Sequence, residues 1–278
     1  IALYVGDGDD MPNWLVIPQE SRDVVEEPVV INHPDVSGSI LDYARHHEVD
    51  LLLVHWKGRP SRGRYLLGRT LDPVIQYAPC DVAVVRVTEP PTDFAARMAA
   101  LGKVLVPASG GPNASLALEL ALDLRPETKV TGLRVALQSM GATAIAAQYE
   151  LLHTTLGPFT GDPRLQPRVA LASGVVAGIV QEAAQGYDLV MIGASRESFV
   201  DRLFFGNLPQ DLAAALPQAL VIVRRHDPAA VAILRRARWR LITAMTQLTP
   251  DERIAVYRQV RRSARPDADF YVMITLAA

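Results

Sequence analysis

Short apolar runs alternate along the chain with longer segments in which apolar residues recur every three or four positions. This alternation is clearest between residues 102 and 226, and its short runs are apolar on both faces. Such a pattern is typical of a parallel sheet with helices on both sides, so it predicts an α/β fold. The expected strands are Lys103–Pro107, Val130–Leu137, Arg168–Ala172, Leu189–Gly193 and Ala219–Arg224.

Helices are expected between these strands, where the apolar spacing changes to the helical period. Pro112 stands near the first position of the first helix, where proline is well tolerated. Ser173 is the expected N-cap of the third helix. The expected helices are Ala114–Leu124, Met140–Leu156, Gly174–Gln185 and Gly206–Leu216.

A long repeat indicates that the chain contains two related units. Asp50–Arg86 matches Asp188–Arg224 without a gap, so each residue of the first copy has its equivalent at one constant offset along the chain. This offset is far longer than the repeat of a solenoid, whose period is ~20–50 residues, and it indicates duplicated domains. Upstream of the first copy, further elements are expected at Ile1–Val5, Val29–Asn32 and Val36–Glu48. The first strand and first helix of that copy have no counterpart, so we expect them upstream of residue 1.

These patterns predict two doubly wound, Rossmann-like parallel-sheet domains and a helical tail. The expected boundaries are 1–88 for a truncated domain, 89–101 for a linker with a short helix near Phe94–Leu101, 102–226 for a complete domain and 227–278 for the tail. A length of 278 residues suits about two domains of ordinary size. Cys80 is the only cysteine, which excludes an internal disulfide and indicates a reducing compartment.

The tail differs from the rest of the chain in charge. The net charge of −2 conceals a segment, from Arg224 to Arg265, with eleven arginines and three acidic residues. Two helices are expected within residues 228–265, and the capping box Thr249–Glu252 marks the start of the second. A continuous apolar run, Phe270–Ala278, ends the sequence. Arginines beside an apolar run are typical of the cytoplasmic side of a membrane span.

The loop after the fourth strand of each copy is the best candidate for a binding site. Ligands of open parallel sheets bind beyond the carboxyl ends of the strands. In both copies this loop ends in a glycine, Gly68 or Gly206, just before a helix. A helix N-terminus offers free N–H groups and a positive dipole end to a phosphate.

The repeat and these loops resemble the universal stress protein family. The nucleotide loop of that family has three spaced glycines followed by Ser or Thr, and it binds ATP in some members. The matching positions are His55, Gly58, Gly68 and Arg69 in the first copy, and Gly193, Arg196, Gly206 and Asn207 in the second. Each copy keeps two of the three glycines, and neither keeps the hydroxyl. The family's acidic residue at the end of strand one corresponds to Ser109.

The resemblance implies ATP or another adenine nucleotide as the ligand, whereas the lost residues indicate weak or absent binding. Three arginines offer an anionic ligand other donors, namely Arg69, Arg196 and Arg202. The first loop also resembles a variant found in stress-protein domains fused to transporters, in which Trp56 would stack on a nucleotide and Lys57 would pair with it. The alternative is that Trp56 packs against the neighbouring domain. The candidate binding residues are Trp56, Lys57, Gly58, Gly68, Gly193, Arg196, Gly206 and Asn207.

The tail resembles a different family. Residues 249–278 are similar to the segment that precedes the first span of the DUF389 family of integral membrane proteins. This resemblance implies a missing membrane domain as a partner, with the remainder of the span beyond Ala278, because a span needs ~20 residues. The arginines favour an anionic lipid surface. Nucleic acid is not expected, because aromatic residues are sparse among the arginines.

The function that these patterns favour is regulatory. No catalytic set and no metal-ligand spacing emerges from the sequence, so an enzyme is not favoured. We expect a sensor or scaffold at the cytoplasmic face of a membrane, forming a homo-oligomer through its stress-protein domains. Two alternatives stay open: a soluble ATP-binding universal stress protein with weak or no ATPase activity, and a structural dimerisation module.

Overall fold

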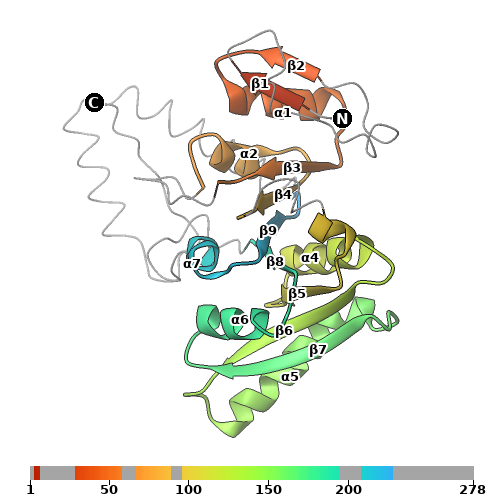
Figure 1. The fold of residues 1–278 in the computed structure, drawn as a ribbon, viewed down its shortest axis with the longest axis vertical. Coiled ribbons are helices and arrows are strands. Elements are labelled where there is room, and N and C mark those ends of the chain that lie inside the picture. The colour runs from red at the N-terminus through yellow and green to blue at the C-terminus, as the bar shows by residue number, and fades with distance from the viewer. Residues whose placement is uncertain (1–2, 7–28, 58–66, 89–95, 195–207, 228–278) are drawn as a thin grey trace, which may run out of the picture. The chain divides into compact units, whose positions relative to one another are not determined.

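The computed structural model describes residues 3–6, 29–57, 67–88, 96–194 and 208–227. Seven strands form one mixed sheet in the order β3-β4-β9-β8-β5-β6-β7, which Figure 1 shows as a continuous ladder. The remaining two strands, β1 (Leu3–Gly6) and β2 (Val29–Asn32), form a separate parallel pair. The seven strands are β3 (Leu51–His55), β4 (Asp81–Arg86), β5 (Lys103–Pro107), β6 (Lys129–Leu137), β7 (Leu165–Ala172), β8 (Leu189–Gly193) and β9 (Ala219–Arg224).

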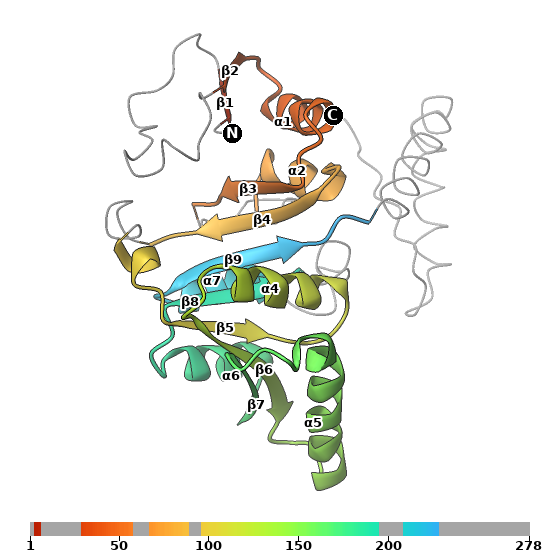
Figure 2. The same ribbon diagram turned by 90° about the vertical axis from the view of Figure 1, so that its right-hand side faces the viewer.

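Helices cover both faces of this sheet (Figure 2). Buried side chains of α4 and α5 lie in one apolar cluster, and those of α1, α2, α6 and α7 lie in the other. The expected α/β fold is therefore confirmed. The helices are α1 (Val36–His46), α2 (Leu71–Tyr77), α4 (Pro112–Asp123), α5 (Ala142–Leu156), α6 (Val175–Ala183) and α7 (Leu208–Ala215), with a 3-10 turn at Gly157–Phe159 and a helical turn at residues 96–99.

Several element boundaries differ from the expected ones by one to three residues, and two starts, those of β7 and α6, have identifiable reasons. Strand β7 begins at Leu165, three residues earlier than expected, and so includes Pro167. A proline is tolerated there because β7 is an edge strand. Helix α6 is capped at Gly174, whose extended backbone starts the helix, and no side chain caps it. The expected role of Ser173 as N-cap is therefore wrong.

The chain divides into two compact units, at residues 1–226 and 227–278. This division coincides with the boundary expected at residue 227. The tail helices expected within residues 228–265, the capping box and the final apolar run lie outside the described residues. Within the described part of the chain, no helix is both long and apolar enough to cross a membrane.

The two copies of the repeat form the same elements at the same register. The bounds of β3 and β4 fall at positions equivalent to those of β8 and β9. Each pair is parallel, with Leu51 opposite Asp81 and Leu189 opposite Ala219. Even the hydrogen bond that follows the strand is repeated: Trp56 N–H donates to Val85 O, and Ala194 N–H donates to Val223 O, both at 2.8 Å. The predicted strand–helix–strand order is therefore confirmed for both copies.

The two copies join edge to edge through one antiparallel pairing. Strand β4 pairs with β9, with Val84 opposite Ile222. Two arginines at equivalent positions cross this junction in opposite directions. Arg86 donates to Leu216 O (2.8 Å) and Gln218 O (3.2 Å) beyond the end of α7, and Arg224 donates to Ile75 O in α2. Each guanidinium thus donates to carbonyl oxygens in or just beyond the last turn of the other copy's helix.

Both apolar clusters of the sheet contain residues from each copy. One includes Trp56 and Val82 of the first copy with Leu212 and Leu220 of the second. The other brings Ala83 together with Val221 and Val223. Because side chains of both copies share these clusters, the junction is part of the core rather than a surface contact. Each fully buried apolar side chain contributes ~1.5–3 kcal/mol to the stability of the fold.

We expect Arg86→Met to destabilise the chain by about 1.5–3 kcal/mol. The substitution keeps an apolar stem but leaves two partly buried carbonyl groups without their charged donor. Urea unfolding followed by circular dichroism measures this loss. Arg45→Met is the matched control, because Arg45 pairs with the exposed Asp42 at the surface, and it should cost less than ~1 kcal/mol. Equal losses in the two variants would show that Arg86 does not hold the junction.

Candidate functional site

The candidate crevice of the second copy lies at the carboxyl ends of β5 and β8. The chain leaves β5 toward β6 on one side and β8 lies on the other, so the sheet has its switch point here. The turn after β5 uses Gly110 and Gly111, whose φ values of 102° and 80° lie in the left-handed region that favours glycine. Helix α4 begins directly after them, with Pro112 in its first turn as expected.

The side chain of Asn113 bonds to backbone groups at the ends of two strands. Its amide nitrogen donates to Ala194 O, which follows β8. Its amide oxygen accepts the backbone N–H of Arg225, which follows β9, at 2.8 Å. One side chain in the first turn of α4 thus bridges the ends of two neighbouring strands.

Gly193 allows α4 to approach β8 closely. A Cβ at this position would lie 2.6 Å from the backbone carbon of Asn113 and 2.7 Å from the backbone nitrogen of Ala114, which is closer than real side chains come. The glycine is thus required by the contact between strand and helix. The resemblance gave Gly193 a role in binding a nucleotide, and the structure gives it a packing role that needs no ligand.

The arginine beside the crevice is already paired with two carboxylates. Arg225 forms an ion pair with Glu119 of α4 and lies 3.8 Å, Nε to Oδ2, from Asp81 of the first copy. Asp81 also accepts the backbone N–H of His226 at 2.6 Å. The cation at this edge therefore has its charge compensated within the protein, and the arrangement ties β4 to α4 and to the end of β9.

Arg134 supports the turn after β5 from the neighbouring strand. Its Nε donates to Gln148 Oε1 at 2.6 Å, and another guanidinium N–H group donates to Ala108 O (3.3 Å) and Ser109 O (3.2 Å). Partial burial lowers the pKa of Arg134. Ser109, which stands where the related family has an acid, thus contributes a backbone carbonyl to a structural contact.

In the first copy, the residues that follow β3 divide into a buried part and an exposed part. Trp56 is 3% exposed and packs in the same apolar cluster as Leu67 and Ile75, so its ring presents no face for stacking on a nucleotide. The same cluster includes Leu212 of the second copy, which agrees with the alternative that Trp56 packs against the neighbouring domain. Lys57 is exposed. The expected stacking role of Trp56 is therefore wrong, and a pairing role for Lys57 stays a prediction.

Gly68 has a backbone conformation that favours glycine. Its φ of 136° is one that other residues rarely adopt, and a Cβ there would meet no atom within 4 Å. It leads into α2, where Asp72 N–H donates to Gly68 O (3.1 Å) and Asp72 Oδ1 accepts Leu67 N–H (2.8 Å). The described atoms leave open space around Gly68. The expected role of Gly68 in binding a nucleotide stays a prediction. The other expected binding residues lie outside the described residues, namely Gly58, Arg196, Gly206 and Asn207.

Two hollows on the described surface lie away from these loops. One of about 380 Å³ runs along α1 and is lined by residues that include His33, Tyr43 and His47. The other, of about 280 Å³, lies beside β7 and is lined by residues that include Tyr149 and Arg168. Among the described residues, no group of three or more His, Cys, Asp and Glu side chains is placed to hold a metal ion.

Asn113, Arg225 and Arg134 are site residues that the sequence did not single out. Asn113 stands 81 residues from Ala194 and 112 residues from Arg225, the partners that define its role. The signal for it was weak but present, since a short amide side chain follows the Ser-Gly-Gly-Pro turn into α4. Nothing in the sequence indicated that Arg225, one of eleven clustered arginines, would pair across the two copies.

Comparisons with known proteins agree with this fold. Residues 15–86 match the model of the universal stress protein family. A putative universal stress protein from Pseudomonas aeruginosa UCBPP-PA14 is 14% identical, with 76% of this chain and 75% of that chain covered and a TM-score of 0.51. A universal stress protein from Archaeoglobus fulgidus DSM 4304 is 16% identical, with coverages of 73% and 69% and a TM-score of 0.48.

A universal stress protein solved in complex with cAMP is also similar, at 16% identity, with 45% of this chain and 98% of that chain covered and a TM-score of 0.36. A comparison with curated proteins found no match. The family match and the likeness to the Pseudomonas protein show an α/β fold of the universal-stress-protein type.

We expect Gly193→Ala to destabilise the chain by about 1–3 kcal/mol, because the added methyl group must displace the backbone of α4. The same substitution at Gly157 is the matched control. Gly157 has helical dihedral angles and no atom near its Cβ position, so Gly157→Ala should leave the stability unchanged or raise it by ~0.4–1 kcal/mol. The midpoints of urea unfolding compare the two variants. A neutral Gly193→Ala would mean that the contact between β8 and α4 is looser than described.

Proposed function

We propose that this chain is a regulatory, non-catalytic pair of universal-stress-protein-type domains, attached at the cytoplasmic face of a membrane to an integral membrane protein. The observation that carries the regulatory part is the set of internal polar contacts at the ends of β8 and β9. Asn113 bonds to the groups at the ends of β8 and β9, and the cation Arg225 is paired with Glu119. Polar groups that already have partners within the protein favour a scaffold over an enzyme.

The first copy supports the same proposal by different means. Its loop has lost a glycine at His55 and a hydroxyl at Arg69, and the ring of Trp56 is buried. A bulkier residue in a phosphate loop prevents the close approach of the backbone that such a loop needs. Adenine nucleotides are therefore weak ligands in this proposal, if they bind at all.

The junction between the copies supports a scaffold as well. Because β4 and β9 pair with each other, neither is available to a second chain. Self-association of the proposed homo-oligomer must then use another surface. The alternative of a structural dimerisation module would have to use another surface as well.

The membrane attachment rests on the tail sequence. Eleven arginines between residues 224 and 265 precede a continuous apolar run at residues 270–278. Their arrangement resembles the approach to the first span in the DUF389 family, and clustered arginines are typical of the cytoplasmic side of a span. The proposed partners are therefore a membrane domain and an anionic lipid surface.

We expect calorimetric titration of the full chain with ATP, ADP and cAMP to give dissociation constants of about 1 mM or weaker, corresponding to no more than ~4 kcal/mol of binding free energy. The physical reason is that the polar groups at the ends of β8 and β9 already have partners within the protein, and that each loop lacks one glycine and the hydroxyl. Submillimolar binding that is abolished by Gly68→Val would contradict the proposal. It would favour the alternative of a nucleotide-binding stress protein.

We expect the full chain to co-sediment with anionic vesicles (phosphatidylcholine with about 30% phosphatidylserine) and not with phosphatidylcholine alone. Binding should weaken as salt rises. Replacing Arg258, Arg261, Arg262 and Arg265 by Gln should weaken it at least tenfold, because each arginine near the surface contributes ~1 kcal/mol.

A second variant removes the same charge from elsewhere in the chain and serves as the control for this experiment. It carries Gln at four exposed positions, Arg45, Arg69, Lys103 and Lys129. It should bind vesicles as the unmodified chain does. Equal binding to both lipids, or equal losses in the two variants, would contradict the membrane-surface role and leave the regulatory role untouched.

A further inference from the structure

Both copies have a hollow at the same place, between a strand and the helix that follows it. Three residues that line the hollow beside β7 are the repeat equivalents of three that line the hollow along α1. They are Val169, Gln181 and Gln185, which correspond to Ile31, Tyr43 and His47. The helices also end alike, because Glu48 and Gly186 are equivalent and both have a positive φ, 48° and 84°. The hollow is therefore a feature of the repeat, and the two linings can be compared residue by residue.

Among the described residues, only the hollow of the second copy contains a buried ion pair. Glu182 is 6% exposed, and its Oε1 lies 2.7 Å from Arg168 Nε. The same oxygen accepts a hydrogen bond from the Tyr187 hydroxyl at 3.2 Å. The first copy has apolar residues at all three equivalent positions, namely Val30, Ala44 and Val49. Because a buried ion pair is seldom more stabilising than apolar residues of similar volume, stability alone does not account for the pair.

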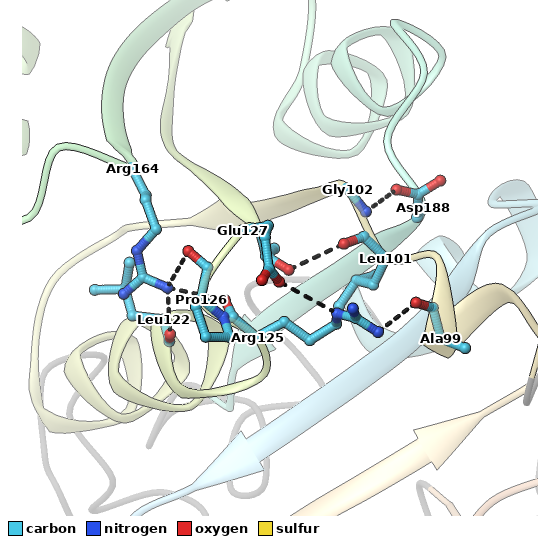
Figure 3. A network of polar contacts seen from close by, with 10 residues as sticks. Ala99, Leu101, Gly102, Leu122, Arg125, Pro126, Glu127, Arg164 and Asp188 are labelled. Atoms are coloured by element: carbon cyan, nitrogen blue, oxygen red, sulfur yellow. Dashed lines mark hydrogen bonds and ion pairs between the residues drawn. The ribbon is translucent and has the colours of Figure 1, made fainter.

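Each partner of this pair keeps hydrogen-bonding capacity that the described residues do not use. Glu182 Oε2 accepts no bond from them, and solvent reaches this atom. The two terminal nitrogens of Arg168 donate to none of them, and the side chain is 56% exposed. Arg164, just before β7, differs, because its guanidinium donates to Asp162 and to carbonyl groups that include Leu122 O at the end of α4 (Figure 3). One carboxylate oxygen and one guanidinium edge are thus available at the hollow that both residues line.

The free edge of β7 adds backbone groups to the same hollow. Ala172 O accepts the N–H of Gln138, which follows β6, so the backbone groups of Ala172 point toward β6. Because the direction of these groups alternates along a strand, the N–H groups of Val169 and Leu171 point away from β6. No strand of the described part of the chain pairs with that edge. Two backbone donors therefore stand beside Arg168.

The remainder of the hollow is small and largely apolar. Ile145 and Tyr149 of α5 and Leu171 of β7 line it. Tyr149 and Leu171 are 49% and 52% exposed. The volume of about 280 Å³ lies below the ~300–1,000 Å³ of pockets that hold drug-sized ligands. The hollow thus suits a small molecule with an apolar portion.

We propose that the hollow beside β7 binds a free α-amino acid with an apolar side chain. The α-carboxylate accepts the terminal N–H groups of Arg168 and the backbone N–H groups at the edge of β7. The α-ammonium group donates to Glu182 Oε2. The side chain of the ligand lies against Tyr149 and Leu171. Such a site depends neither on the proposed membrane attachment nor on the regulatory role.

The ion pair decides between an amino acid and a simpler ion. An anion alone would satisfy Arg168 but would place its charge beside the Glu182 carboxylate with no donor between them. A cation alone would satisfy Glu182 and repel Arg168. A zwitterion gives each charge of the site an opposite charge and adds no net charge to the hollow.

Calorimetric titration of the full chain with L-leucine, L-valine and L-phenylalanine tests the site, and two blocked derivatives separate its contacts. N-acetyl-L-leucine lacks the ammonium group, and L-leucinamide lacks the carboxylate. We expect L-leucine to bind and each derivative to bind at least tenfold more weakly, because it leaves one charge of the site without its partner. L-leucine should also slow the hydrogen exchange of Val169 and Leu171.

Substitutions within the ion pair identify which contact each derivative has lost. Arg168→Met should weaken the binding of L-leucine at least tenfold and leave that of L-leucinamide unchanged, since L-leucinamide has no carboxylate. Glu182→Gln should weaken the binding of L-leucine and leave that of N-acetyl-L-leucine unchanged. A pair with a purely structural role would affect all these ligands alike.

A double variant, Arg168→Val with Glu182→Ala, gives the second copy the residues that the first copy has at these positions. It should fold and lose L-leucine binding. The matched control is Asp42→Ala with Arg45→Ala, which removes an exposed ion pair from α1, beside the other hollow. The control should bind L-leucine as the unmodified chain does. Circular dichroism confirms that each variant is folded.

Three outcomes would overturn the proposal. One is that none of the three amino acids binds. A second is equal affinity for L-leucine and both derivatives, which would show that the ion pair does not select a zwitterion. The third is undiminished binding by the folded double variant, which would place the site elsewhere in the chain. Each of these outcomes would leave the proposed regulatory role untouched.

Discussion

The antiparallel pairing of β4 with β9 is the interaction on which the rest of this structure depends. It makes one sheet out of two copies of a repeat and merges their apolar side chains into shared clusters. Arg86 and Arg224 then fix the junction by reaching carbonyl groups of the opposite copy. Strand β4 and helix α2 of the first copy are thereby joined to the second copy.

The sequence predicted much of this fold because two matching segments indicated the same order of strands and helices. The ungapped match between the copies predicted equal element bounds, and β3 and β4 do match β8 and β9 at both ends. Strands that are apolar on both faces predicted helices on both sides of the sheet. The apolar pattern of the sequence could not show that the two copies share one sheet. Whether β4 pairs with β9 depends on which strand lies beside it, and the sequence of β4 alone does not reveal that strand.

The crevice was less predictable, because its contacts join residues that are distant in the sequence. Asn113 forms hydrogen bonds with Ala194 and Arg225. Arg225 forms ion pairs with Glu119 and with Asp81 of the other copy. A motif comparison indicated that glycine at position 193 serves a phosphate, whereas the contact with α4 requires glycine without any ligand. The same glycine is consistent with both roles, and only the surroundings distinguish them.

Equivalent positions in the two copies have diverged most where their neighbours differ. His55 replaces Gly193 where no described helix comes close, and the leucines of β3 are exposed where those of β8 are buried. Apolar residues on an uncovered face are a liability unless something covers them in use. The second copy connects the ends of its strands through Asn113, whereas Leu51 and Leu53 of the first copy are exposed. The proposed regulation is therefore expected to use contacts of the first copy.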